Sequence, residues 1–188
     1  MKIMNNLLIL LMWIINIISI ILNITINYEV NILISIALSI VIILPRLLKN
    51  KFQITDTMEF IFLIFVLLAG EFGSILKFYD IIYWYDSFTH FLSGALTGYM
   101  GLIILSKTKI LDKNKFFSIL FIISLILAVA AAWEIFEFTS DSLLGYDAQR
   151  VLETGVSDTM KDIICALLGG ITFIALYLFK KNAKNNVH

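Results

Sequence analysis

Charged side chains recur at helical spacing within the long apolar stretches of this sequence. Residues three or four apart lie on one face of a helix. A charge in the middle of a membrane helix costs roughly 2.5–3.5 kcal/mol on insertion scales, and such charges usually mark function. The residues concerned are Asp86 with His90, Glu134 with Glu137, Asp158 with Asp162, and Glu71 by itself. These groups are the first candidates for a functional site.

The candidates are expected at one depth. An α-helix rises about 1.5 Å per residue, which places His90 and Asp162 about 6 Å into their helices. Glu134 and Glu71 would lie about 8–9 Å from the ends of theirs by the same rise. Four helices would then bring acids and one histidine to the same shallow level on one side of the molecule, which predicts a shared site.

A shared acidic site has specific chemical requirements. Six or seven neighbouring carboxylates repel one another, and a bound cation or shared protons relieve that repulsion. Carboxylate oxygens with one imidazole suit Zn²⁺, Mn²⁺, Mg²⁺ or non-haem iron. We therefore expect a divalent metal ion as cofactor. The expected metal ligands are His90, Glu137, Asp158, Asp162 and Glu71.

Other polar residues receive supporting roles in this interpretation. Glu134 is the expected general base, and Asp86 would orient His90. Lys161 and Arg150 would bind an anionic headgroup. Two alternatives stay open: a network that couples protons or ions to transport, and polar residues that only cap helices or hold them together.

Six apolar stretches must position these residues. The chain has 188 residues, of which 60% are hydrophobic, whereas soluble domains average about 45–50%. A helix that crosses the bilayer core needs about 20 mostly apolar residues. The stretches are about 3–22, 30–45, 57–77, 86–106, 116–139 and 158–179. The sequence predicts an all-α polytopic membrane protein in which residues 1–188 form a single domain of about six transmembrane helices.

The basic residues predict the orientation. If every stretch crosses the membrane, eleven of the 14 basic residues fall on one side. They are Lys2, Arg46, Lys49, Lys51, Lys107, Lys109, Lys113, Lys115, Lys180, Lys181 and Lys184. By the positive-inside rule that side is cytoplasmic, so both the N- and the C-terminus are predicted to be cytoplasmic and the acids extracytoplasmic. The lysines stand in short separate groups, which argues against a nucleic-acid partner.

Small residues lie beneath the acids on two of the predicted helices. Gly94 and Gly98 follow His90, and Ala166 and Gly169 follow Asp162. Small residues let membrane helices approach closely. These faces are therefore expected to point inward, with the acids above them.

The segment from Asp86 to Gly170 resembles a family of uncharacterised prokaryotic inner-membrane proteins typified by YjdF. The matching elements are Asp86-x-x-x-His90-Phe91 with Gly94, Trp133-Glu134-x-x-Glu137-Phe138, Gly145, and Asp158-Thr159-x-x-Asp162 with Gly169. VanZ-like proteins are similar at a greater distance, in the Asp-x-x-x-His-Phe opening and a later pair of aspartates. The resemblance implies a multi-pass protein of the prokaryotic plasma (inner) membrane with a shared polar pocket, and it supplies no reaction.

The function expected from these residues is a metal-dependent hydrolase or transferase that acts on a lipid or lipid-linked headgroup. A metal ion would lower the pKa of a bound water, and the lipid bilayer would hold both protein and substrate. The alternatives are a small ion- or proton-coupled transporter that uses the same acidic pocket, and a non-catalytic envelope factor. A carrier needs a path to the cytoplasm, yet the faces below the acids are small and mostly apolar, which favours the enzyme.

Overall fold

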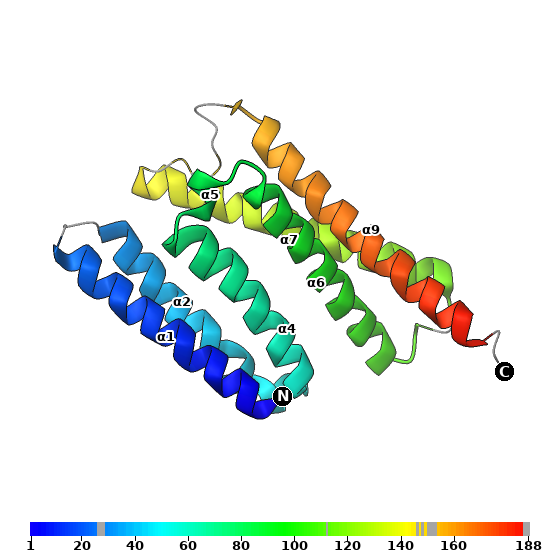
Figure 1. Ribbon diagram of the computed structural model, residues 1–188. Coiled ribbons are helices and arrows are strands. Elements are labelled where there is room, and N and C mark those ends of the chain that lie inside the picture. Colours follow the sequence, from blue (N-terminus) through cyan, green and yellow to red (C-terminus); the bar gives the residue numbers. More distant parts are fainter. Residues whose placement is uncertain (26–28, 112, 146, 148, 150–153, 186–188) are drawn as a thin grey trace. The chain divides into compact units, whose positions relative to one another are not determined.

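The computed structural model describes residues 1–25, 29–111, 113–145, 147, 149 and 154–185, and its regular elements are helices (Figure 1). The chain divides into two compact units, Met1–Asp86 and Ser87–His188, and each is described by itself. The division falls within the first turn of helix α6, Tyr85–Lys107, which is described with the C-terminal unit. The single-domain interpretation stays a prediction.

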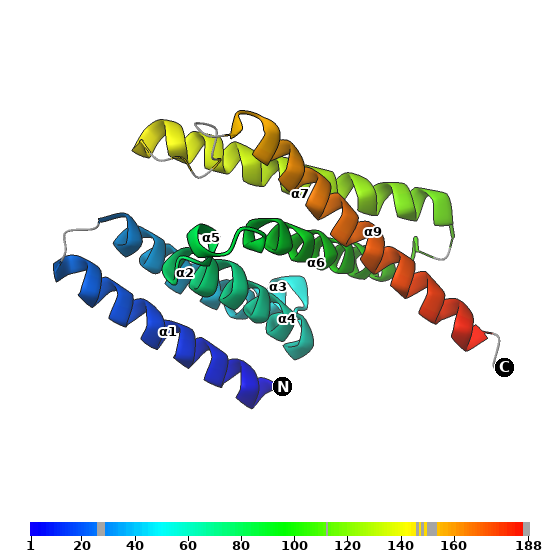
Figure 2. The ribbon, with the colours of Figure 1, turned by 45° about the horizontal axis from the view of Figure 1, so that its top comes forward.

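The N-terminal unit is built on two adjacent long helices, α1 and α2, which lie side by side in both ribbon views (Figures 1 and 2). Its remaining helices complete the bundle, and α4 contacts both α1 and α2. The elements are α1 Lys2–Thr25, α2 Glu29–Leu47, α3 Lys49–Phe52, α4 Asp56–Val66, the π-helix η1 Leu67–Ile75 and α5 Phe78–Ile81.

Local chemistry explains where α4 begins. The Thr55 hydroxyl accepts a hydrogen bond from the Met58 amide at 3.2 Å, which caps the helix start. Within the first turn, Glu59 is buried and binds Arg46 with an Nη2–Oε1 distance of 2.7 Å. Lys49 pairs with Asp56. The first pair joins the end of α2 to α4, and the second joins the start of α3 to the start of α4.

The third predicted span, 57–77, continues from α4 into η1. The Leu76 amide donates to the Glu71 carbonyl at 2.8 Å, a five-residue hydrogen bond that marks the wider π register. Together α4 and η1 form an apolar segment, Asp56–Ile75, that is long enough to cross a membrane. π-Helical turns are rare and frequently occur at functional sites, so η1 singles out Glu71, which lies at its centre.

The core of the N-terminal unit is a cluster of apolar side chains from three of its elements, α1, α2 and α4. It consists of Ile9, Met12, Ile42, Leu63 and Val66. The inward face of α1 also carries amides, because Asn5, Asn16 and Asn23 are buried beside these apolar residues.

The C-terminal unit contains three long helices: α6, α7 (Lys115–Leu144) and α9 (Ser157–Asn185). Asn114 caps α7 by accepting a hydrogen bond from the Phe117 amide at 3.0 Å. Gly145 ends α7 with a left-handed φ of 73°, a conformation that glycine adopts without steric cost. The core of this unit is formed by Leu102, Leu105, Ile122, Ile126, Ala130, Ala166 and Ile174.

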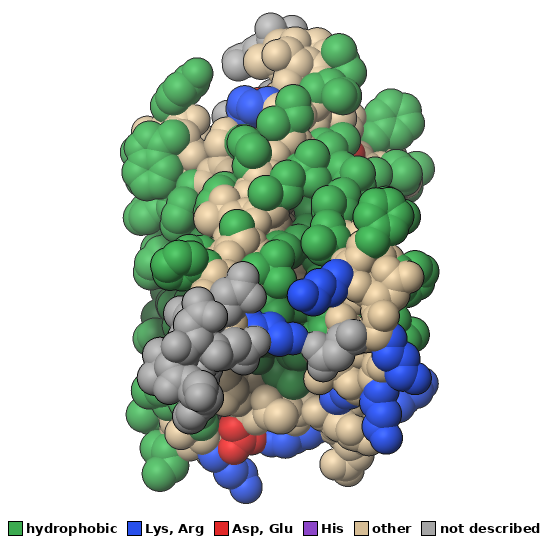
Figure 3. All heavy atoms as spheres, turned by 90° about the vertical axis from the view of Figure 1, so that its right-hand side faces the viewer, with side chains coloured by type: hydrophobic (Ala, Val, Ile, Leu, Met, Phe, Trp, Pro, Cys, Tyr) green, Lys and Arg blue, Asp and Glu red, His purple; other side chains and the backbone are tan. Residues whose placement is uncertain are grey.

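These observations confirm the predicted all-α membrane class. Among the described residues, five helices are long and apolar enough to cross a membrane, and Asn31–Leu47 is a shorter apolar helix. Figure 3 shows apolar side chains exposed on this face, chiefly in its upper part. α7 continues five residues past the predicted end at 139, and α9 continues past 179 to Asn185. The cytoplasmic placement of the termini stays a prediction.

Candidate functional site

Two helices of the C-terminal unit bring a histidine and an aspartate together. His90 lies in the second turn of α6 and Asp162 in the second turn of α9, with the His90 Nε2 and Asp162 Oδ2 atoms 4.0 Å apart. Asp86 precedes His90 by one turn on the same face of α6. One ligand atom from each of the three residues lies within 4.8 Å of the others. We call Asp86, His90 and Asp162 the acid–histidine cluster.

Close contact between the helix backbones explains this proximity. Gly94 follows His90 by four residues, and a Cβ atom built on it would lie 1.7 Å from the carbonyl oxygen of Ala166, which follows Asp162 by four residues. A Cβ atom on Gly169 would lie 1.9 Å from the Phe91 carbonyl oxygen. Only glycine permits these approaches, so the expectation that small residues draw the two faces together is confirmed for α6 and α9.

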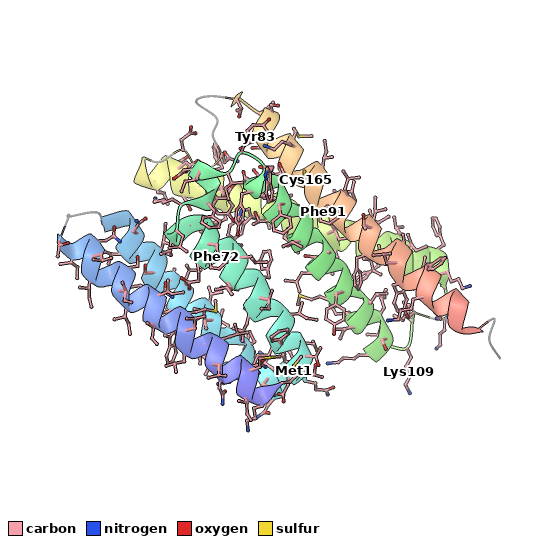
Figure 4. The ribbon with its side chains drawn as sticks, in the orientation of Figure 1. Met1, Phe72, Tyr83, Phe91, Lys109 and Cys165 are labelled. Atoms are coloured by element: carbon pink, nitrogen blue, oxygen red, sulfur yellow. The ribbon has the colours of Figure 1, made fainter. Side chains whose placement is uncertain are left out.

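Figure 4 labels Phe91 on α6 and Cys165 on α9, which mark this level on the two helices. His90 is 8% exposed and Asp162 is 3% exposed, while Asp86 is half-buried. The Asp162 carboxylate and the His90 imidazole are thus largely removed from solvent, and charged groups in such surroundings need partners.

The dimensions of the cluster suit one metal ion. Two ligand atoms on opposite sides of an ion at about 2.0–2.6 Å are about 4–5 Å apart, and the three ligand atoms of the cluster all lie within 4.8 Å of one another. Carboxylate oxygens and an imidazole nitrogen are ligands for Zn²⁺, Mn²⁺ or iron. The donor set therefore fits the expected cofactor, with three of the usual four to six ligand positions supplied.

Glu134 is buried on α7 and is connected to α9 through a glutamine. The Gln149 side-chain amide donates to the Glu134 backbone carbonyl at 3.1 Å and to Glu134 Oε2 at 3.4 Å. The same amide lies 3.4 Å from the Thr159 hydroxyl, three residues before Asp162. The Asp141 carboxylate accepts a bond from the Gln149 backbone amide at 3.0 Å. Gln149 thus connects the end of α7 to the first turn of α9, one turn before Asp162.

The other predicted residues of this unit make separate contacts. Glu137 is half-buried, and its Oε1 accepts a hydrogen bond from Trp133 Nε1 at 2.9 Å. Asp158 is buried and pairs with Lys161, with an Oδ1–Nζ distance of 2.5 Å. Lys161, predicted to bind a headgroup, therefore already neutralises an acid of its own helix. Arg150 lies outside the described residues.

Glu71 belongs to the N-terminal unit, where Asn16 Nδ2 of α1 donates to its Oε1 at 3.1 Å. Among the described residues, the acid–histidine cluster is the group whose ligand atoms meet, and Glu71, Glu137 and Asp158 are not members of it. Their assignment as metal ligands stays a prediction.

Sequence reasoning missed two sets of buried amides. Gln149 lies in a loop segment whose polar residues resemble those of any connection between helices. The burial of the α1 asparagines could have been predicted from the sequence. Asn16 and Asn23 are seven residues apart, which is two helical turns, inside an apolar run. Such spacing predicts one shared face, and both residues are indeed buried.

Comparison with known proteins identifies a family of membrane proteins that matches most of this chain. A family model described as predicted membrane protein (DUF2238) matches residues 4–183. A protein of Thermotoga maritima described as uncharacterized is 32% identical over 125 residues, 63% of this chain. The match spans 60% of that relative's length. The search of solved structures found no significant match.

Proposed function

This chain belongs to the predicted membrane protein family DUF2238, and within that class we propose that it is a metal-dependent hydrolase or transferase. The observation that carries the proposal is the acid–histidine cluster, whose ligand atoms lie within 4.8 Å of one another. The proposed substrate is a lipid or lipid-linked headgroup, because apolar side chains surround the helices that carry the cluster. The site would face the extracytoplasmic side of a prokaryotic plasma membrane.

The roles follow from position. Asp86, His90 and Asp162 would hold the metal, and a metal so held supplies a water acidic enough to act as a nucleophile near neutral pH. Glu134, buried and oriented by Gln149, is the proposed general base, which would take the proton of the attacking water. His90 and Asp162 both lie near the N-terminal ends of their helices, α6 and α9, so the proposed substrate would approach the cluster from those ends.

A transporter is the second candidate, and one observation favours it. Buried amides and hydroxyls line the inward faces of α1 and α2 in the N-terminal unit, which is the kind of polar interior that an ion-coupled carrier requires. The metal-dependent enzyme remains the leading proposal, since the cluster combines a histidine with two acids on facing helices.

Metal content tests the proposal directly. Purified protein in detergent is loaded with Zn²⁺ or Mn²⁺, passed through a desalting column and measured by elemental analysis. We expect about one ion per chain in the parent protein and loss of the ion in His90→Ala and Asp162→Asn. The control is Asp80→Asn, an exposed acid of α5, which should retain the ion. Equal metal content in all four proteins would refute a metal at the cluster.

Activity separates the enzyme from the alternatives. The protein is reconstituted with phosphatidylethanolamine and phosphatidylglycerol, and released headgroups are followed by mass spectrometry with and without a chelator. Metal-dependent release that Glu134→Gln abolishes while metal stays bound supports the enzyme. Retained metal with intact lipids, tested also with isolated polyprenyl-linked lipids, would favour a carrier or an envelope factor.

A further inference from the structure

Glu71 occupies the centre of the π-helix η1 and is completely buried, with 0% of its surface exposed. Phe72, the next residue on η1, is labelled in Figure 4. Asn16 Nδ2 donates to Glu71 Oε1 at 3.1 Å. The second carboxyl oxygen, Glu71 Oε2, and the amide oxygen, Asn16 Oδ1, are both buried without a hydrogen-bond partner. Two acceptors in one contact pair therefore lack a donor.

Charged groups on the elements packed around η1 are occupied elsewhere. Arg46 of α2 binds Glu59, and Lys49 binds Asp56. Glu59 precedes Glu71 by twelve residues, about 18 Å along a helix at the usual rise, and Lys2 precedes Asn16 by a still longer distance on α1. These groups stand at the far end of the unit from Glu71.

Among the described residues, several further titratable groups follow η1 in the chain. The Tyr79 ring lies against Gly73, where a Cβ atom would come within 2.4 Å of it. Tyr85 donates its hydroxyl to the Leu68 carbonyl at 2.9 Å. Asp80 is exposed on α5, and Lys77 separates η1 from α5. Glu29 is the first residue of α2. An ionised Glu71 would thus be a buried charge supported by one amide hydrogen bond, a costly state in a membrane interior.

A single proton satisfies both unpartnered oxygens. An ionised carboxylate only accepts hydrogen bonds, whereas a protonated carboxyl also donates one. With the proton on Oε2, the carboxyl donates to Asn16 Oδ1 while Asn16 Nδ2 donates to Oε1, so each planar group gives one hydrogen bond and receives one. A metal ion would need several further oxygen ligands beyond this pair.

We propose that Glu71 and Asn16 form a proton-binding site within the N-terminal helical unit, separate from the acid–histidine cluster. Uptake adds a proton to the Oε2 lone pair, and release returns it to water, with no change in any other bond. The site is a carboxyl–amide pair that exchanges protons with one end of the unit along a row of buried polar side chains.

That row, which we call the polar seam, consists of Asn16, Ser19, Asn23, Asn31 and Ser35. Asn23 Nδ2 lies 3.3 Å from Ser19 Oγ, and Ser35 Oγ lies 3.0 Å from Ser19 Oγ. Asn31 Nδ2 donates to Asn23 Oδ1 at 3.2 Å, beside the end of α1. All five residues are at most 8% exposed. Polar seams also hold membrane helices together, but helix association alone does not require the two unpartnered oxygens at Glu71 and Asn16.

Chemical labelling tests the proton on Glu71. Dicyclohexylcarbodiimide takes the proton of a carboxyl on its nitrogen, while the carboxyl oxygen adds to its central carbon and the adduct rearranges to a stable N-acylurea. Acids in water have pKa values near 4 and are ionised above about pH 6. The full chain in phospholipid vesicles should carry one adduct, mapped to Glu71 by mass spectrometry, and the adduct should diminish as pH rises.

Glu59 is the matched internal control, because it is 1% exposed but paired with Arg46. It should stay unlabelled in the same sample, and Glu71→Gln should remove the adduct. The wild-type peptide map needs no variant, so it decides the question even if that variant fails to fold. An unlabelled Glu71 at every pH would overturn the proposal. So would labelling that Na⁺ or Mg²⁺ suppresses at constant pH, since a metal cation would then occupy the site.

Infrared spectroscopy tests the partner and the route. The carboxyl C=O band of Glu71, identified by its loss in Glu71→Gln, should move to higher frequency in Asn16→Leu because its hydrogen bonds are gone. Transfer to D₂O should shift this band more slowly in Ser35→Ala than in Ser39→Ala, a control one turn away on α2. A band indifferent to Asn16→Leu would refute the pair, and equal exchange in the two serine variants would refute the seam as the route.

Discussion

At the scale of single residues, the buried Asp158 carboxylate is paired with a lysine of its own helix. The Asp158 side chain is 6% exposed and the Lys161 side chain 45% exposed, and their charged atoms meet at 2.5 Å. Lys161→Met would leave a buried carboxylate without its cation and should lower the free energy of unfolding by about 1–3 kcal/mol. Asp158→Asn should cost less, since asparagine serves a helix start about as well as aspartate. Thermal unfolding in detergent measures both.

Lys180→Met, which changes an exposed lysine in the last part of α9, is the control for lost charge and should leave the unfolding midpoint almost unchanged. Metal content of the same proteins tests the predicted role of Asp158 as a ligand. If Asp158→Asn loses the bound ion while Lys161→Met keeps it, Asp158 is a metal ligand and its role is not limited to pairing with Lys161.

At the scale of elements, two glycines one turn apart on α6 make a matched pair. A Cβ atom on Gly94 would meet the Ala166 carbonyl oxygen at 1.7 Å, whereas one on Gly98 would have its closest neighbour, the Phe173 ring, at 3.3 Å. Gly94→Ala must therefore separate α6 from α9, costing about 1–3 kcal/mol as overpacking usually does. Gly98→Ala should be nearly neutral. Unfolding midpoints in detergent compare the two.

The same pair tests how the cluster is assembled. Gly94→Ala should also weaken Zn²⁺ or Mn²⁺ retention, although it changes no ligand, because His90 and Asp162 would move apart. Retention equal to that of Gly98→Ala would show that the α6–α9 contact does not set the distance between them.

The helices themselves were predictable because length and apolarity decide membrane spans. The π register of η1 was not, since the residues of 67–75 are as apolar as those of an ordinary helix and the wider turn has no compositional mark. Asp86 and His90 were predictable as a pair from their spacing. Their meeting with Asp162 depended on the backbone contact at Gly94, which sequence indicates only as small residues on a face. The Asn16–Glu71 contact joins residues 55 positions apart, and no local pattern reports such a pairing.

At the scale of the whole molecule, the open prediction is orientation. Lys113 lies two residues before α7 and Ser142 lies in its last turn, so single cysteines at these positions in a Cys165→Ala background should report opposite sides of the membrane. Position 142 should react with an impermeant thiol reagent in intact cells, and position 113 only after the cells are opened, because basic residues favour the cytoplasmic side. Labelling of position 113 from outside would reverse the predicted topology.

The composition of α6 has a consequence for how the protein is made. Of the five helices long enough to span the bilayer, α6 is the least apolar and the most enclosed by other parts of the chain. It leaves the ribosome before α7 and α9, the helices whose side chains share its core. A segment so weakly hydrophobic gains little from lipid alone, and an aspartate and a histidine in its first turns lower that gain further. We therefore expect the insertion of α6 into the bilayer to depend on the helices that follow it more than the insertion of the other spans does. The glycines that let α9 pack closely against α6 also make the stable placement of α6 in the bilayer depend on α9. That helix begins about seventy residues later in the chain.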